Sequence, residues 1–196
     1  MEYLKGSKIR KSDCKIDKIF LDRWSSRSMS GEEITNEELF SLFEAARWAP
    51  SAYNEQPWRF IYVKRNSEKW AESLFLLSEP NQVWCKNAAV LICLVSKRNF
   101  SYNNSPNKNH LSDAGAAWEN LALQASITGL VSHGMVGLDF EKARAFFQLP
   151  EEFEIVQMIA VGKPADSKIL PKEIQKIESP NERKSIKEFV FEEKFN

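Results

Sequence analysis

The longest apolar run of the sequence, AAVLICLV from Ala88 to Val95, restricts the folds that the chain can adopt. A strand with one solvated face alternates apolar and polar residues, whereas this run does not alternate, so it predicts a strand buried on both faces. Such a strand must be covered by other elements on each side. The run is also too short for a transmembrane helix, which needs about 20 residues.

Patterns on both sides of this run predict helices and further strands. Thr35 and Glu38 in TNEE form a capping box, in which the two residues satisfy each other's free amides at the start of a helix. Pro50 ends that helix, because the residue before a proline is pushed out of the helical region. Helical spacing continues at 16–20, 67–78, 111–128 and 140–149, and strands are predicted at 58–63 and 154–164, with a loop or short strand at 131–139.

The helical and strand segments interleave along the chain. This order favours an α+β fold, or an α/β sandwich, with about four strands. At 196 residues, we expect residues 1–196 to form a single domain, with a charged extension over about 172–196.

The balance of charge limits the partners that we expect. Lys plus Arg and Asp plus Glu number 27 each, so the basic surplus of a nucleic-acid-binding protein is absent and no polybasic membrane surface is indicated. The charged N-terminal segment lacks the apolar stretch of a signal peptide. Cys14, Cys85 and Cys93 fit no zinc spacing, which favours reduced thiols. We therefore expect a soluble cytoplasmic protein with no nucleic-acid or membrane partner.

Most catalytic motifs are absent, but two polar groups stand out. The chain has no P-loop, no GxGxxG and no GxSxG, and two histidines are too few for a histidine-rich metal site, so we expect no metal. The first polar group is RWSSR at 23–27, with two arginines four residues apart and serines between them. Guanidinium and hydroxyl donors suit a phosphate, although a solvated surface loop would show the same spacing.

The second polar group lies in RWAPSAYNEQPWRFIYV, over 47–63, between a predicted helix and a predicted strand. Pro50 and Pro57 are explained as a helix stop and a strand start. Asn54 and Gln56, held between the prolines, suit hydrogen bonds to a planar heterocycle that could lie on the small residues beside them.

Four landmarks, in order along the chain, resemble the FMN-dependent nitroreductase family. RWSSR resembles the family's RRSxR, and APSAYNEQPWRF resembles its APSxxNxQPWxF. DAGAAWENLALQASITGLVSHGMVGLDFEKA resembles its central helix and the following GxxxHxMxGFD, and NERKSIKEFV resembles its closing xxRKPLxExV. The resemblance implies a nitroreductase-like sandwich, with a central mixed sheet of about four to five strands flanked by helices. It also implies a homodimer in which the C-terminal extension wraps the partner subunit.

The resemblance implies that FMN is the cofactor and that its phosphate is held by two parts of the chain. Arg23 and Ser25 match phosphate-binding positions of the family, and Arg183 in the C-terminal motif matches another. Trp24 replaces a residue that is usually basic, so only its backbone is expected to contribute. Arg27 matches a basic position near the pyrimidine edge of the flavin, where a fixed cation favours reduction.

The implied surroundings of the flavin ring come from two further segments. The N5 edge is expected to face the backbone of Val136 and Gly137, and glycine permits a close approach. Gln56 and Trp58 are expected to brace the proline-containing loop and to start the next strand. The residues of this loop that match positions lining the ring, bound mainly by the other subunit, are Pro50, Ser51, Ala52 and Asn54.

Three residues depart from the family pattern or have an open role. Tyr53 is bulkier than usual and would either narrow the substrate space or stack on the substrate. Leu138 replaces the usual Phe, which we interpret as a packing change. His133 matches a family histidine, and we interpret it as a polar residue that orders its loop.

The implied activity transfers hydride from NADH or NADPH to flavin N5 and then reduces an acceptor such as a nitroaromatic or a quinone. One shared site would give ping-pong kinetics, and no side-chain acid or base is obligatory because the cofactor performs the chemistry. Two alternatives remain open. The chain could catalyse another flavin reaction, namely dehalogenation, reduction of activated alkenes or flavin fragmentation, or it could form a flavin-binding dimer without turnover.

Overall fold

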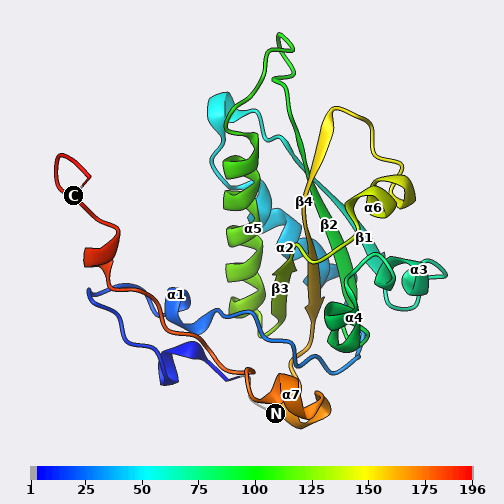
Figure 1. Ribbon diagram of the computed structural model, residues 1–196, viewed down its shortest axis with the longest axis vertical. Coiled ribbons are helices and arrows are strands. Elements are labelled where there is room, and N and C mark those ends of the chain that lie inside the picture. Colours follow the sequence, from blue (N-terminus) through cyan, green and yellow to red (C-terminus); the bar gives the residue numbers. More distant parts are fainter. Residues whose placement is uncertain (1–3, 196) are drawn as a thin grey trace.

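The computed structural model describes residues 4–195, and a four-stranded sheet with the order β1-β2-β4-β3 lies at its centre (Figure 1). The strands are β1 (Trp58–Lys64), β2 (Val90–Lys97), β3 (Val131–Met135) and β4 (Phe153–Gly162). All three neighbouring pairs are antiparallel. The expected α+β class, sandwich and strand number are confirmed. Within one chain, however, the sheet is antiparallel, so the expectation of a mixed sheet is wrong. That expectation failed because an apolar pattern indicates which faces a strand buries and not the direction in which the strand runs.

Helices cover both faces of this sheet and make the structure a three-layer sandwich. On one face lie α2 (Asn36–Arg47) and α5 (His110–Ile127), which share a core with Val90, Ile92 and Leu94 of β2. On the other face lie α3 (Trp70–Leu74), α4 (Glu79–Cys85) and α6 (Phe140–Phe146). Alternate residues of β2, namely Leu91, Cys93 and Val95, belong to that second core. The prediction of a strand buried on both faces is therefore confirmed.

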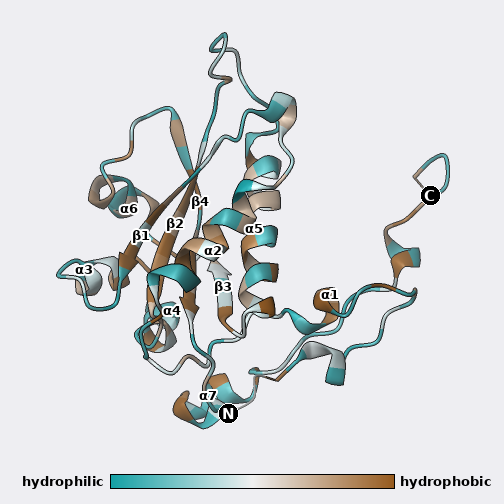
Figure 2. Cartoon of the chain, turned by 180° about the vertical axis from the view of Figure 1, so that it is seen from behind, coloured by the Kyte–Doolittle hydropathy of each residue, from teal (hydrophilic) through white to brown (hydrophobic). Residues whose placement is uncertain are grey.

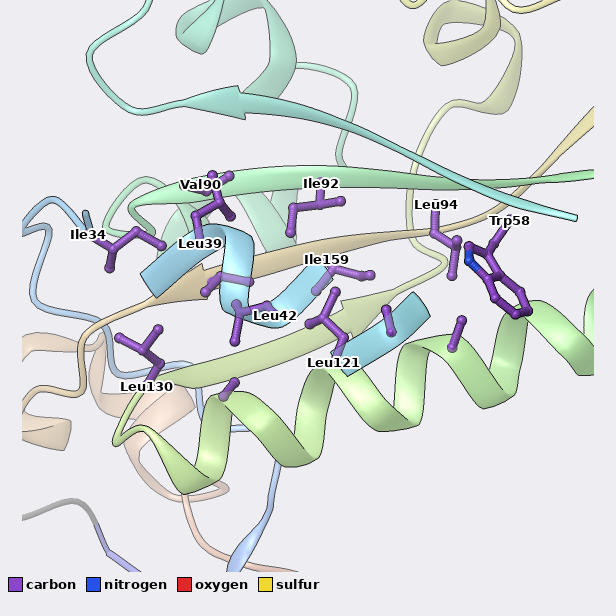
Figure 3. Close-up of a cluster of buried hydrophobic side chains, with 14 of the residues drawn as sticks. Ile34, Leu39, Leu42, Trp58, Val90, Ile92, Leu94, Leu121, Leu130 and Ile159 are labelled. Atoms are coloured by element: carbon purple, nitrogen blue, oxygen red, sulfur yellow. The ribbon is translucent and has the colours of Figure 1, made fainter. Parts of the chain in front are cut away.

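The capping box at the start of α2 forms as predicted. The Thr35 hydroxyl accepts a hydrogen bond from the Glu38 amide at 3.0 Å, and the Glu38 carboxylate accepts one from the Thr35 amide at 2.7 Å. Leu39 and Leu42 are fully buried between the helix and the sheet (Figure 3). A cap of this kind stabilises a helix by about 1 kcal/mol and fixes where the next loop begins.

The long helix α5 begins one residue earlier than expected and buries a line of small residues. The sequence predicts one apolar stripe along this helix, with Leu111, Ala114, Trp118, Leu121, Ala122 and Ala125. Of these residues, Ala114, Leu121, Ala122 and Ala125 are fully buried. The expectation for Leu111 is wrong, since 43% of it is exposed. It lies in the first turn of the helix, directly after a polar loop, where little of the sheet is left to cover it.

Shorter elements differ more from the sequence expectation. The helix expected over 67–78 is reduced to α3, and α4 follows it with Pro80 in its first turn, the usual position for a helical proline. The first helix, α1, spans Ile19–Asp22 only, and the segment over 131–139 contains the short strand β3. None of the helices within residues 4–195 is long and apolar enough to cross a membrane.

Both ends of the described chain form an arm that leaves the sandwich (Figure 1). Before the chain enters the arm, it forms a 3-10 turn at Ser167–Ile169 and α7 (Lys172–Gln175), where Leu170 and Ile174 pack on the second core. The arm contains short 3-10 turns at Gly6–Lys8 and Ile186–Glu188. The N-terminal and C-terminal segments lie side by side in the arm. Arg10 donates to the Asn181 carbonyl at 2.7 Å, and Asp13 accepts from Ser185 at 2.8 Å. Apolar residues stay exposed along the arm, near α1 and close to the C-terminus (Figure 2).

Candidate functional site

The segment from Arg23 to Ser28 lies outside the helices and strands, and its residues alternate between buried and partly covered. Trp24, Ser26 and Ser28 are buried, whereas Arg23, Ser25 and Arg27 are only partly covered. The less buried residues of the segment therefore carry two guanidinium groups and one hydroxyl. We call Arg23, Ser25 and Arg27 the donor face.

The inward side chains of this segment are tied to the rest of the protein. The indole of Trp24 donates to the Leu4 carbonyl at 2.7 Å, so this side chain points away from the donor face. Only the backbone of Trp24 is left to contribute to the site, as the sequence suggests. Further along, the Ser30 amide donates to the Lys163 carbonyl at 2.9 Å, which fastens the segment to the chain just after β4.

A carboxylate from the C-terminal tail, Glu178, lies beneath the donor face. Only 2% of its side chain is exposed. Its Oε1 accepts from the amides of Arg27 at 2.7 Å and Ser28 at 3.0 Å, and from the hydroxyls of Ser26 at 2.7 Å and Ser28 at 3.0 Å. Its Oε2 lies 3.5 Å from the Arg27 guanidinium. Glu178 was not selected from the sequence, because nothing distinguishes it there from the other glutamates of a charged tail.

The other residues of the donor face keep donors available for a ligand. Arg23 makes a long ion pair of 3.7 Å with Glu119 on α5, whose side chain is half exposed. Arg10 fixes the Arg23 backbone by donating to its carbonyl at 2.7 Å. In the described part of the chain, the Ser25 hydroxyl makes no hydrogen bond. Such a set of donors suits a ligand with acceptor oxygens and negative charge.

His133 on β3 supports the same segment from behind. Its Nδ1 lies 3.3 Å from the Ser26 carbonyl, and its ring packs on Trp84 with 4.7 Å between the ring centres. Burial, reinforced by the nearby Arg27 cation, lowers the pKa of His133 to about 4. The ring is therefore neutral at pH 7, which agrees with the interpretation that it orders the loop.

The buried neutral state of His133 predicts a pH-dependent stability. Between pH 6.5 and about 4 the unfolded histidine takes up a proton that the folded one does not, so stability should fall as the pH falls. This contribution is at most about 1.4 kcal/mol per pH unit. Urea unfolding of the native chain and of His133→Gln at pH 5, 6 and 7 measures it. We expect a shallower decline in the variant, and equal slopes would show that His133 is not responsible.

Gly137 follows β3 and packs closely against the start of α4. Its carbonyl accepts from the Ser78 amide at 2.9 Å and from the Asn81 side chain at 3.1 Å. A Cβ at this position would come within 2.8 Å of both side chains, so a larger residue would require Ser78 and Asn81 to shift. Among residues 4–195 the Gly137 amide donates no hydrogen bond, and its neighbour Val136 is 67% exposed.

The proline-containing loop is held by its own polar groups. The Ser51 hydroxyl accepts from the Gln56 amide at 3.0 Å, and the Gln56 side chain donates to the Asn54 carbonyl at 2.9 Å. Asp113, buried at the start of α5, accepts from the Ala52 amide at 3.1 Å. The bracing role expected of Gln56 is confirmed. Asp113 was not foreseen, because an acidic residue in the first turn of a helix is already explained by the helix dipole.

The apex of the loop is exposed and conformationally unusual. Tyr53, Asn54 and Gln56 have left-handed φ values of 52°, 57° and 51°. Asparagine tolerates this region, but a tyrosine there is disfavoured by about 1–2 kcal/mol. Tyr53 is 85% exposed and makes edge contacts with Phe100 and Tyr102. Pro50 and Asn54 are exposed as well, so the loop presents a free surface.

The loop and the donor face contact different parts of α5. Asp113, which holds the loop, and Glu119, which pairs with Arg23, are six residues apart. This separation corresponds to about 9 Å along the helix and about 120° around it. Arg183 donates to the carbonyls of Asn181 and Glu182 in its own tail. A single chain therefore presents the loop, the donor face and Arg183 on separate surfaces.

Comparison with known proteins identifies the family to which this fold belongs. The model of the Nitroreductase family matches residues 21–76 and 65–163, and the chain belongs to the nitroreductase family. A protein of Archaeoglobus fulgidus, whose name proposes NADH dehydrogenase or NAD(P)H nitroreductase activity, is 32% identical over 77% of this chain and 86% of its own length.

Solved structures share the fold over nearly the whole chain. A crystal structure described as an oxidoreductase containing FMN is similar with a TM-score of 0.92 and 38% identity, covering 95% of this chain and 96% of that one. A nitroreductase family protein from Streptococcus pneumoniae has a TM-score of 0.72 at 20% identity, covering 89% of this chain and 98% of that one. At this lower identity the likeness concerns the fold alone.

Proposed function

We propose that the chain is an FMN-dependent oxidoreductase that takes electrons from NADH or NADPH. The observation that carries the proposal is the donor face, which presents two guanidinium groups and a hydroxyl on a segment fixed from beneath. The solved structure described as containing FMN is 38% identical in sequence to this chain, which supports the same cofactor here. Bound FMN would accept electrons from the nicotinamide and pass them to an acceptor such as a nitroaromatic or a quinone.

The residues of the chain fit such a ligand by their chemistry. Arg23, Ser25 and Arg183, with the backbone of Trp24, would hold the phosphate, whose charge of about −2 suits two arginines. Arg27 would lie near the pyrimidine edge, where negative charge develops on reduction. The remaining contacts are assigned to the backbone of Val136 and Gly137, whose exposed amide side suits a ring edge, and to the loop residues Pro50, Ser51, Ala52 and Asn54.

We propose that the protein is a homodimer and that the loop lines the ring held by the other subunit. A compact monomer of 22.6 kDa should expose about 9,500 Å², whereas this chain exposes 11696 Å². Much of the excess belongs to the arm, where Phe20, Phe189 and Val190 are 53%, 60% and 61% exposed. Burial of these side chains on a second copy would explain why the arm, including the extension over about 172–196, leaves the sandwich.

The state of the cysteine thiols supports a proposal for the cellular compartment of the protein. Cys14, Cys85 and Cys93 are all free, and two of them are buried. Free thiols are typical of a reducing compartment, so the cytoplasm is the proposed location.

Arg27→Ala should slow flavin reduction by NADH or NADPH more than it weakens FMN binding. The proposed partner of Arg27 is charge that is present mainly after reduction, so its loss acts on the transition state. A loss of about 2 kcal/mol in transition-state stabilisation corresponds to a rate of flavin reduction that is roughly 30-fold lower. Anaerobic stopped-flow mixing measures the rate, and Arg59→Ala on β1 serves as a control. A normal rate in the Arg27 variant would place the cation elsewhere.

Donor and acceptor should bind in turn at one site. We therefore expect parallel double-reciprocal lines when the nicotinamide and a quinone are varied together. Lines that intersect would require separate sites.

His133→Ala should retain most of the turnover, since a neutral imidazole is a poor proton donor at pH 7.

A further inference from the structure

Glu178 is the most completely buried charged group near the donor face, and it comes from a distant part of the sequence. It lies about 150 residues after the segment that it contacts. Four donors of Ser26, Arg27 and Ser28 converge on its Oε1. A buried carboxylate is unfavourable unless it is paired and hydrogen-bonded, so this arrangement strongly selects one conformation of the segment.

The contacts of Glu178 also determine which side chains point outward. It binds the Ser26 and Ser28 hydroxyls and the intervening Arg27 amide, so both serines are drawn inward. The burial of the segment follows these contacts, since Ser26 and Ser28 are buried whereas Ser25 and Arg27 are only partly covered. The same carboxylate lies 3.5 Å from the Arg27 guanidinium and offsets part of its charge. Two further titratable groups face the segment: Glu119, which pairs with Arg23, and His133, which lies behind Ser26 and is neutral at pH 7.

We propose that Glu178 is a positioning residue that both orients the donor face and lowers the reduction potential of FMN held there. This inference rests on the proposed function. Reduced flavin carries negative charge, and a fixed cation stabilises it. By offsetting the Arg27 cation, Glu178 makes reduction less favourable than Arg27 alone would. Because Glu178 belongs to the C-terminal tail, the tail is expected to control both the orientation of the donor face and the reduction potential of FMN.

Three variants separate orientation from charge. Glu178→Gln keeps an oxygen acceptor and removes the charge, Glu178→Ala removes both, and Glu173→Gln is a matched control on the exposed helix α7, where it pairs with Lys176. The midpoint potential of bound FMN is measured against a reference dye, and FMN affinity is measured by fluorescence. Exchange of the Arg27 and Ser28 amides in the FMN-free protein is followed by NMR.

Glu178→Gln should keep FMN affinity within about threefold and shift the balance toward reduced flavin about tenfold, which is about 30 mV for a two-electron couple. Glu178→Ala should weaken FMN binding at least about tenfold and release the two amides to exchange at least about tenfold faster. Glu173→Gln should match the native chain. An unchanged potential in Glu178→Gln, or unchanged amide exchange in Glu178→Ala, would overturn the inference.

A failure of the proposed function would look different. A native chain that binds no FMN would contradict the proposed function, while amide exchange would still report whether Glu178 orients the segment. If Glu178→Ala does not fold, Glu178→Gln tests the charge effect alone, and its amide exchange should lie between those of the native chain and an unprotected segment.

Discussion

Arg23→Ala and Arg183→Ala are each expected to weaken FMN binding by about 10- to 150-fold. A charge-assisted hydrogen bond contributes about 1.5–3 kcal/mol, which converts to this range of affinity. Arg23 is available because the ion pair that it forms within residues 4–195, with a half-exposed Glu119, is long at 3.7 Å. Arg183 makes hydrogen bonds only to carbonyls of its own tail within the described residues, and these are easily exchanged for a phosphate.

Titration of FMN-free protein with FMN, followed by fluorescence, gives the affinities. Arg47→Ala is the matched control, since Arg47 is an exposed arginine on α2 that pairs with Glu44. Its FMN affinity should equal that of the native chain. Unchanged affinity in both the Arg23 and the Arg183 variants would mean that the phosphate is bound elsewhere.

Removal of residues 181–196 should abolish both the dimer and FMN binding. The truncated chain loses Arg183, the exposed phenylalanines of the tail, and the Asn181 carbonyl that Arg10 holds at 2.7 Å. Arg10 also binds the carbonyls of Leu21 and Arg23, so the donor face loses part of its support. Light scattering should report a mass near twice 22.6 kDa for the native chain, whereas the truncated chain should have the mass of one shortened chain, below 22.6 kDa.

Arg183→Ala separates the two effects of truncation. This variant keeps the apolar tail, so it should remain a dimer while it binds FMN more weakly. A truncated chain that is a stable yellow monomer would refute the assignment of the tail to the dimer interface.

The central layer of the fold could be predicted because its signals are local. The run over 88–95 has no polar residue, so β2 had to be buried on both faces, and the Thr35 and Glu38 pair fixed the start of α2. Elements of one or two turns, such as α1 and α4, were missed or misplaced because so few residues give no clear period. Strand direction was also missed, since antiparallel and parallel neighbours can bury the same side chains.

The candidate site was predictable where the chain carries several donors close together. Arg23, Ser25 and Arg27 do share one face, as their spacing in RWSSR allows. The groups that hold them, Glu178 and Arg10, come from the two ends of the chain, and their charge alone suggests a solvated surface. Their importance arises from burial, which the sequence does not record. Gly137 was selected for a ligand, whereas in the structure a side chain there would also meet Ser78 and Asn81.

The most direct test of the proposed function is anaerobic mixing of the purified protein with NADH and with NADPH. The protein should purify yellow with about one FMN per subunit, as the single donor face of each chain implies. The flavin absorbance should bleach with at least one nicotinamide and return when a quinone or nitroaromatic is added. A colourless protein that binds no added FMN would contradict the account, and bound FMN that neither nicotinamide bleaches would leave a flavin-binding dimer without turnover.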